Sequence, residues 1–341
     1  MPLVYSNIIL TSIQNKKMDQ KTYVAKKKFR DLVEFTNEKK SHGEFTLPVD
    51  QNKLNDLIQS RVKDNSFTQM SHEDLMEFAS ENKSLYKANA PFPSIYFDDF
   101  FKPHKLRDVV NELPELGKEK NDIHYANPNE NKYASKGEYR FGPKTKALLH
   151  YMNSQPFLEF LQELTGIEET LIPDPYFEGG GFHQIKPGGF LKIHVDFHKH
   201  KLMQLDRRLN VLVYLNENWD ESYGGHFELW EKNMSKCVTK IAPLFNRMAM
   251  FSTTGNSYHG HPNVLTCPPD RTRRSLALYY YTNGRPASEL NDDQKDRITT
   301  TFVARKGADS VQMKIFNTIT NLANDMLPPF LVRIIKKFRN K

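Results

Sequence analysis

The chain has 341 residues, of which 38% are hydrophobic and 26% charged, and its formal net charge is +7 at pH 7. This balance is ordinary for a soluble protein, and no apolar run approaches the ~20 residues that a membrane-spanning helix needs. The basic residues are scattered and no nucleic-acid-binding motif is present, which disfavours nucleic acid as a partner. Cys237 and Cys267 are too few for a disulfide framework, so we expect a reducing compartment, the cytoplasm.

Residues 1–90 are polar and read as a helical N-terminal extension. Apolar residues recur at helical spacing over 54–62, and Ser71 with Asp74 forms a capping-box pattern ahead of a second apolar stripe. We expect these helices to pack against the following domain or to cover its mouth. The start of the chain lacks a basic stretch ahead of its apolar patch, so a secretory signal is not expected; a weak organelle-targeting segment is the alternative.

Strand and helix patterns alternate after residue 90. Residues 91–101 combine prolines with β-branched and aromatic residues, which is typical of a strand. Helical patterns follow at 102–116, 143–153 and 155–166, the last with Gly166 as a stop. The sequence therefore predicts a strand and three helices before the main β region.

From residue 175 the apolar period shifts towards two, with turn signals between the segments. The predicted strands are 176–186, 188–196, 208–216, 225–231, 237–243, 247–253, 262–266, 274–282 and 299–306. Short strands at this spacing predict a β barrel or jelly roll. Because helices precede it, we expect an α+β fold: a catalytic domain over 91–306 with its jelly-roll core over about 175–306.

Residues 307–341 form an amphipathic helical tail with a basic end, interrupted at Pro328 and Pro329. A helix packed on the outside of the barrel or at a dimer contact is the favoured interpretation. Association with a membrane surface through this tail is the alternative. The sequence does not predict the oligomeric state.

Two polar residues near the start of the β region carry the chemistry. His194 and Asp196 are two positions apart in a predicted strand, so their side chains point to one face. His259 follows a later strand and a tight turn, and it could supply a third ligand. Two imidazoles and one carboxylate hold one face of an octahedral Fe(II) and leave positions open for other ligands.

A basic residue lies where an acid could bind beside this metal. Arg273 opens the strand after His259 and alternates onto one face with Ser275. A guanidinium binds a carboxylate through two hydrogen bonds, which suits the distal carboxylate of a keto acid. The two patterns together are more specific than either alone.

The combined pattern resembles the catalytic core of the Fe(II)/2-oxoglutarate-dependent oxygenases, in particular the prolyl 4-hydroxylase-like branch. The matching segments are PGGFLKIHVDF, DRRLNVLVYLNENW, YGGHFELWE, PLFNRMAMF, SYHGHP and RRSLALYYYT, and PFPSIYFDDFF resembles the strand that precedes this domain in relatives. The resemblance covers residues 91–285. It implies a double-stranded β-helix as the core.

The resemblance also implies site residues and cofactors. His194, Asp196 and His259 would be the catalytic iron ligands, and Arg273 would pair with the C5 carboxylate of 2-oxoglutarate. Tyr214 would hydrogen-bond the same carboxylate, and Ser275 would assist Arg273. Fe(II), 2-oxoglutarate and O2 are the implied cofactors, with ascorbate as a further candidate. Halogenating relatives replace the carboxylate ligand with a small residue, so Asp196 argues against halogenation.

Neighbouring residues leave some choices open. His261 is an alternative to His259 as ligand, although the family pattern places the ligand directly before Gly260. Arg274 lies on the opposite face from Arg273 and is expected to be structural. The substrate-binding candidates are His198, Arg207 and Asn210, each with a structural alternative, and His200 is a weaker candidate.

The substrate is not specified by these motifs. With no secretory signal and no second barrel domain, we expect an oxygenase that activates an aliphatic C–H bond of a small, amino-acid-derived, carboxylate-bearing substrate, with succinate and CO2 as co-products. Hydroxylation, ring closure and desaturation all use the same metal site. A prolyl hydroxylase acting on a protein or peptide is the second hypothesis, and a non-catalytic jelly-roll binding module with a retained metal site is the third.

Overall fold

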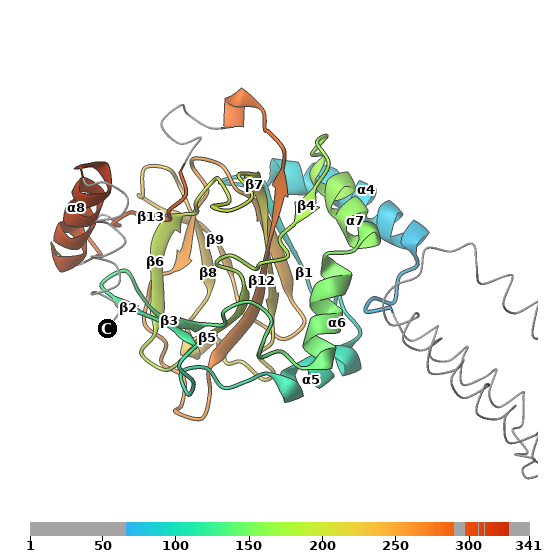
Figure 1. The fold of residues 1–341 in the computed structure, drawn as a ribbon, viewed down its shortest axis with the longest axis horizontal. Helices are drawn as coiled ribbons and strands as arrows, with labels where there is room; N and C mark the ends of the chain where they lie inside the picture. Colours follow the sequence, from blue (N-terminus) through green and yellow to red (C-terminus); the bar gives the residue numbers. More distant parts are fainter. Residues whose placement is uncertain (1–65, 290–296, 306, 310, 327–341) are drawn as a thin grey trace, which may run out of the picture. The chain divides into compact units, whose positions relative to one another are not determined.

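The computed structural model describes residues 66–289, 297–305, 307–309 and 311–326 (Figure 1). In chain order its elements are α4 (His72–Ala88), β1 (Ser94–Phe97), α5 (Pro103–Glu112), β2 (Ile123–Asn127), β3 (Glu130–Ala134), α6 (Pro143–Met152), α7 (Gln155–Thr165), β4 (Ile172–Pro173), β5 (Gly181–Ile185), β6 (Phe190–Val195), β7 (Asp206–Tyr214), η1 (Glu221–Tyr223), β8 (Phe227–Trp230), β9 (Cys237–Ile241), β10 (Met248–Ser252), β11 (Tyr258–His261), β12 (Arg273–Thr282), η2 (Ala287–Glu289), β13 (Thr301–Phe302) and α8 (Val311–Met326). The helix predicted over 54–62 and the tail beyond 326 lie outside the described residues.

The helices predicted within the described residues are confirmed, and their ends follow local chemistry. Ser71 Oγ accepts a hydrogen bond from the Asp74 amide while an Asp74 carboxylate oxygen accepts one from the Ser71 amide, so α4 begins with a capping box. α5 and α6 begin at prolines, which lack the amide that a first helical turn leaves unpaired. α7 ends at Gly166, whose φ of 68° is the left-handed conformation that glycine adopts without strain.

The strands form an antiparallel sheet that curls into a nearly closed barrel, which confirms the predicted jelly-roll core. Their order is β1-β10-β7-β12-β5-β3-β6-β11-β8-β9. In this order the larger half consists of β1, β10, β7, β12 and β5, and the smaller half of β6, β11, β8 and β9. β3 pairs with both β5 and β6 and so joins the two halves.

Helices α4 to α7 lie along one side of the barrel, beside β1 and β12 (Figure 1). Their apolar residues share one core with the outward side chains of the larger half; among its members are Leu106, Phe157, Phe160, Val211, Met250 and Leu278, each at most 1% exposed. This packing fixes the larger half and leaves the interior of the barrel free for a polar site.

Two strand predictions need correction, and one hairpin was not predicted. Residues 262–266 form no strand, because Pro262 has no amide to donate and Leu265 packs instead in a small cluster with Trp219 and Cys267. Within residues 299–305, the described part of the prediction over 299–306, the strand is limited to Thr301–Phe302, and the Val303 amide donates beyond it to the Ile193 carbonyl at 2.9 Å. The hairpin of β2 and β3 was not predicted, because its residues are mostly polar and half-buried.

The chain returns to the smaller half after β12. Thr301 pairs with Val195 and Phe302 with His194, so β13 lies along the edge of β6 opposite to β11 (Figure 1). α8 follows, and Asn317 on it accepts a hydrogen bond from Asn129 at 2.7 Å. Among the described helices, α8 included, none is both long and apolar enough to span a membrane.

Candidate metal centre and cosubstrate site

Two histidines lie side by side on adjacent strands of the smaller half of the barrel. His194 on β6 and His259 on β11 are direct partners in the antiparallel register. Directly paired residues project to the same face of a sheet, and the two ring centroids are 4.3 Å apart. A tight turn leads into β11, where Ser257 Oγ donates to the Thr254 carbonyl at 2.9 Å. The register and the turn together place both imidazoles inside the barrel.

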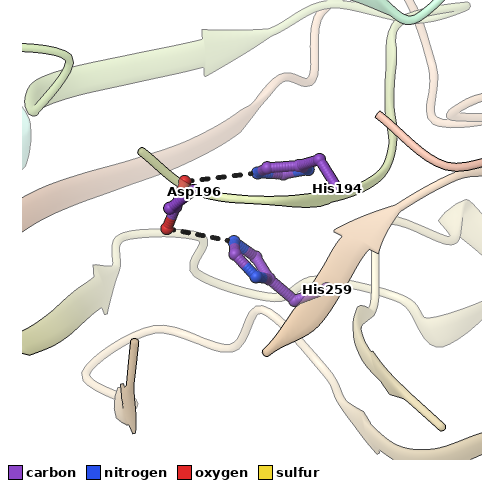
Figure 2. Close-up of side chains that lie close together, drawn as sticks. All are labelled: His194, Asp196 and His259. Carbon is purple, nitrogen blue, oxygen red and sulfur yellow. Dashed lines mark ion pairs between the residues drawn. The ribbon is translucent and has the colours of Figure 1, made fainter. Parts of the chain in front are cut away.

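Asp196 completes the cluster directly after β6. One carboxylate oxygen lies 3.6 Å from His194 Nε2 and the other lies 3.5 Å from His259 Nε2 (Figure 2). All three residues are buried. Across the part of the chain that the structure describes, this is the one group of three such side chains whose donor atoms lie within 4.8 Å of one another.

The backbone sets which nitrogen of each imidazole faces the carboxylate. His194 Nδ1 lies 2.9 Å from the Lys192 carbonyl, and His259 Nδ1 lies 2.8 Å from the Ser257 carbonyl. A carbonyl only accepts hydrogen bonds, so each Nδ1 carries the proton and each Nε2 offers a lone pair. Two lone pairs and two carboxylate oxygens thus converge without a proton between them. A cation fits this arrangement, and the donor set matches Fe(II).

The protonation states also suit a metal. Burial, and next the neighbouring His194, lower the pKa of His259 to about 3. Burial alone would raise the pKa of Asp196, but the Arg207 guanidinium and the two imidazoles hold it well below its usual range. Metal ligands must be deprotonated, and these two residues are so at neutral pH.

Arg207 and Asn210 on β7 hold the Asp196 carboxylate. Arg207 Nη2 donates to one oxygen at 2.8 Å and Asn210 Nδ2 donates to the same oxygen at 3.2 Å. The other oxygen therefore keeps its lone pairs. The Arg207 guanidinium carbon lies 3.4 Å from the centroid of the Tyr279 ring, so an aromatic face covers the guanidinium.

Aromatic rings surround the two imidazoles. Phe251 lies 4.4 Å and Phe227 5.5 Å from the His259 ring, centroid to centroid. Phe302 on β13 lies 5.3 Å from the His194 ring. These rings keep the centre apolar on the sides that the ligands do not occupy.

Arg273 lies in the barrel interior at the start of β12, as predicted. Its Nε donates to the Gly225 carbonyl at 2.7 Å, and its Nη2 donates to the Tyr214 hydroxyl at 3.4 Å. Arg273 is 4% exposed, and no described carboxylate pairs with it. Burial lowers the pKa of Arg273. A buried guanidinium without a counter-charge fits the carboxylate of an organic acid.

The other predicted site residues are distributed as follows. Ser275 is buried and pairs with Tyr214 across β12 and β7, two positions from Arg273. Arg274 lies half-buried and donates to Thr272 Oγ1, which agrees with a structural role. His198 is fully buried, and both its ring nitrogens lack a partner among the described residues.

Two features of the site were not found by sequence reasoning. The bond between Arg207 and Asp196 was missed, although both residues were candidates; the signal was two polar residues, Arg207 and Asn210, on one strand beside the HxD pair. The contact of Phe302 with His194 was missed because the strand at 299–306 had no assigned neighbour.

His200, the weaker substrate-binding candidate, makes a hydrogen bond within its own turn: its Nδ1 accepts from the Leu202 amide at 3.1 Å.

Residues 180–281 match the model of the 2OG-Fe(II) oxygenase superfamily. This match covers the strands that carry His194, Asp196, His259 and Arg273. The chain is a 2-oxoglutarate-dependent dioxygenase, and its cofactors are Fe(II), 2-oxoglutarate and O2. A search of curated proteins gives no match.

The comparison with solved structures gives, among others, the following three. A prolyl hydroxylase from Trichoplax adhaerens, in complex with a hypoxia inducible factor peptide, is 16% identical, with a TM-score of 0.48 over 64% of this chain and 96% of that one. A Pseudomonas putida prolyl-4-hydroxylase is 18% identical, with a TM-score of 0.45 over 60% and 100%. HygX from Streptomyces hygroscopicus, with nickel and 2-oxoglutarate bound, is 12% identical, with a TM-score of 0.42 over 66% and 96%.

Proposed function

We propose that this dioxygenase oxidises an aliphatic C–H bond of a small, amino-acid-derived substrate that bears a carboxylate. The charge of the site supports this proposal. Arg207 and Arg273 bring two buried positive charges, and Asp196 brings one negative charge. A divalent iron adds two positive charges and the 2-oxoglutarate dianion two negative ones. One positive charge is then left unmatched, and a substrate carboxylate complements it.

Unpartnered polar atoms near Asp196 support a polar substrate as well. Within the described residues, buried atoms without a hydrogen-bond partner include both ring nitrogens of His198, Arg207 Nε, Asn210 Oδ1 and the Tyr281 hydroxyl. These residues are contiguous: the Arg207 amide donates to the His198 carbonyl at 2.7 Å, and Tyr281 pairs with Arg207 across β12 and β7. Buried polar atoms are normally satisfied, so a ligand with donors and acceptors suits them.

The residues divide the work of the reaction. His194, Asp196 and His259 would hold the iron, while Arg273 and Tyr214 would hold the distal end of 2-oxoglutarate. When bound, these cofactors with O2 supply the oxidation of an unactivated C–H bond, with succinate and CO2 as co-products. Arg207 and Asn210 fix the Asp196 carboxylate, and Phe227, Phe251 and Phe302 exclude water from the imidazoles.

A metabolite screen by mass spectrometry tests the proposal. The Fe(II)-loaded protein with 2-oxoglutarate should convert a small carboxylate to a product that has gained one oxygen atom or lost two hydrogen atoms, and should form succinate in step. Asp196→Ala should form neither product. Conversion of the methyl ester of the same compound as fast as the acid would contradict the role of the carboxylate.

The same screen run on a peptide library separates the second hypothesis. Hydroxylation of a prolyl peptide, with no metabolite converted, would replace the small-molecule proposal with a protein or peptide substrate. His198→Leu serves as a further check, since it should weaken the binding of a small polar substrate while leaving the binding of 2-oxoglutarate within about twofold. His150→Leu, a change at an exposed histidine of α6, is the matched control.

A further inference from the structure

His261 is a buried imidazole that the metal centre leaves unused. It is 3% exposed, and within the described residues neither of its ring nitrogens has a hydrogen-bond partner. Native proteins keep few buried polar atoms unpartnered, and each such atom calls for an explanation. His261 is also absent from the group of side chains that could share a metal ion with His259.

The strand pairing places His261 beyond the metal ligands. His261 comes two residues after His259 in β11, which pairs in regular register with β8, so the two side chains share a face. On the β6 side the partner of His259 is His194 and that of His261 is Leu191, three residues earlier, with a register shift between the two pairs. His261 therefore lies further along the strand, towards the start of β6 and away from Asp196.

The neighbouring strand β8 leads from His261 towards Arg273. Gly260 pairs with Glu228, so His261 follows opposite the start of β8. Gly225, just ahead of β8, is the residue whose carbonyl accepts from Arg273 Nε. After burial itself, the Arg273 charge is the strongest influence that lowers the pKa of His261, which agrees with this placement.

The donors around Arg273 leave room for another. A carboxylate has two oxygens with about four lone pairs to satisfy. Arg273 Nε donates to the Gly225 carbonyl, so the two terminal nitrogens of the guanidinium can face a ligand. The Tyr214 hydroxyl accepts from Arg273 Nη2, which leaves its own proton free to donate. A guanidinium directs two of its N–H groups at one carboxylate, and the Tyr214 hydroxyl adds a third donor. A fully satisfied carboxylate accepts about four hydrogen bonds, so one acceptor position remains.

We propose that His261 donates a hydrogen bond to the distal carboxylate of 2-oxoglutarate, beside Arg273 and Tyr214. This role makes His261 a specificity-determining residue for a dicarboxylic keto acid. It rests on the dioxygenase assignment and does not depend on the substrate proposed above. His261 then serves the cosubstrate and not the metal, although it stands only two residues from a metal ligand.

Calorimetric titration of the Ni(II)-loaded protein with 2-oxoglutarate, without O2, tests this role. His261→Leu should weaken 2-oxoglutarate binding about 10- to 100-fold, the loss expected for one hydrogen bond to a charged group. His261→Asn and His261→Gln each carry an amide near one ring nitrogen, and one of them should recover most of the affinity. His150→Leu should bind 2-oxoglutarate like the unaltered protein.

Two further measurements make the result specific. Pyruvate is a keto acid without the distal carboxylate, so His261→Leu should bind it as the unaltered protein does. The Ni(II) affinity and the thermal midpoint of the metal-free variant should not fall. An unchanged 2-oxoglutarate affinity would overturn the proposal. So would an equal loss of pyruvate binding, or loss of Ni(II), which would make His261 a metal ligand.

Discussion

Arg207 and Arg273 are both buried in the barrel, at 0% and 4% exposure, yet their surroundings differ. Arg207 donates to Asp196, and this ion pair raises the pKa of Arg207 despite its burial. Arg273 has a backbone carbonyl, a hydroxyl and an aromatic ring around it, and its pKa is lowered. Asp196 neutralises the first charge, whereas the second has no carboxylate partner among the described residues.

The contrast separates two functions of one residue type. Removing one partner of a buried ion pair destabilises the fold, because the other charge then stays buried without a counter-charge. An unpaired buried charge costs stability in the free protein and gains it back when an anion binds. Arg207 should therefore matter most for the integrity of the metal site, and Arg273 for cosubstrate affinity.

Asp196→Ala tests the paired side of this contrast and should have the largest effect. The substitution leaves Arg207 buried without a counter-charge and removes a candidate metal ligand. The free energy of unfolding should therefore fall by about 3–5 kcal/mol, and succinate formation should cease. Urea denaturation measures the first and a coupled assay the second. Asp108→Ala breaks the exposed pair with Lys144 and should cost less than about 1 kcal/mol. Equal losses in the two variants would contradict the contrast.

Arg273→Met tests the unpaired side. Its loss should weaken 2-oxoglutarate binding by about 2–5 kcal/mol, because a charged partner of a buried carboxylate is lost. Iron affinity should stay within about twofold, and the metal-free protein should be at least as stable as before. Calorimetric titration measures both affinities, and Arg274→Met is the matched control. If Arg274→Met, and not Arg273→Met, weakens the binding of 2-oxoglutarate, Arg274 is the anchor.

Ligand-linked stability gives a third test of the same contrast. With metal present, 2-oxoglutarate at about 100 times its Kd should raise the free energy of unfolding by about 2.7 kcal/mol. A chelator should remove the gain because the keto acid loses its metal. Arg273→Met should show less than half of it at the same concentration. Differential scanning fluorimetry monitors the stabilisation. If 2-oxoglutarate stabilises Arg273→Met as much as the unaltered protein, Arg273 does not bind the acid.

Asn210→Ala should have the smallest effect. Asn210 donates to Asp196 at 3.2 Å, a longer bond than that of Arg207. Loss of such a supporting bond typically weakens metal binding about 10- to 100-fold, and we expect the lower end because Arg207 remains. Competition with a coloured chelator measures the Ni(II) affinity. A loss as large as that of Asp196→Ala would make Asn210 an equal partner in the site.

The grouping of the three candidate metal ligands and the burial of Arg273 were predictable in part, because short-range geometry encodes them. Two positions in a strand place His194 and Asp196 together, and alternation separates Arg273 from Arg274. The structure brings these residues to one interior as predicted, while their roles in binding stay predictions. The third ligand depended on the resemblance, since spacing alone does not choose between His259 and His261.

What could not be predicted depends on pairing between distant strands. Arg207 lies on β7 in the larger half of the sheet, and Asp196 follows β6 in the smaller half. No local sequence pattern indicates that these two distant segments come together. The β2–β3 hairpin was missed because its residues are mostly polar and only Ala134 among them is buried. The strand wrongly predicted at 262–266 shows the converse: apolar residues after Pro262 pack as a loop without joining the ladder.

The pairing of β13 with β6 has a consequence beyond the placement of Phe302. β11 occupies one edge of β6, and β3 covers the beginning of the other edge. β13 covers the remainder of that edge at Val195 and His194, and Arg305 and Asp309 bind each other just beyond it. An open strand edge is a template for pairing with another chain. Displacement of β13 would therefore open the edge of the strand that carries His194 to pairing with another chain.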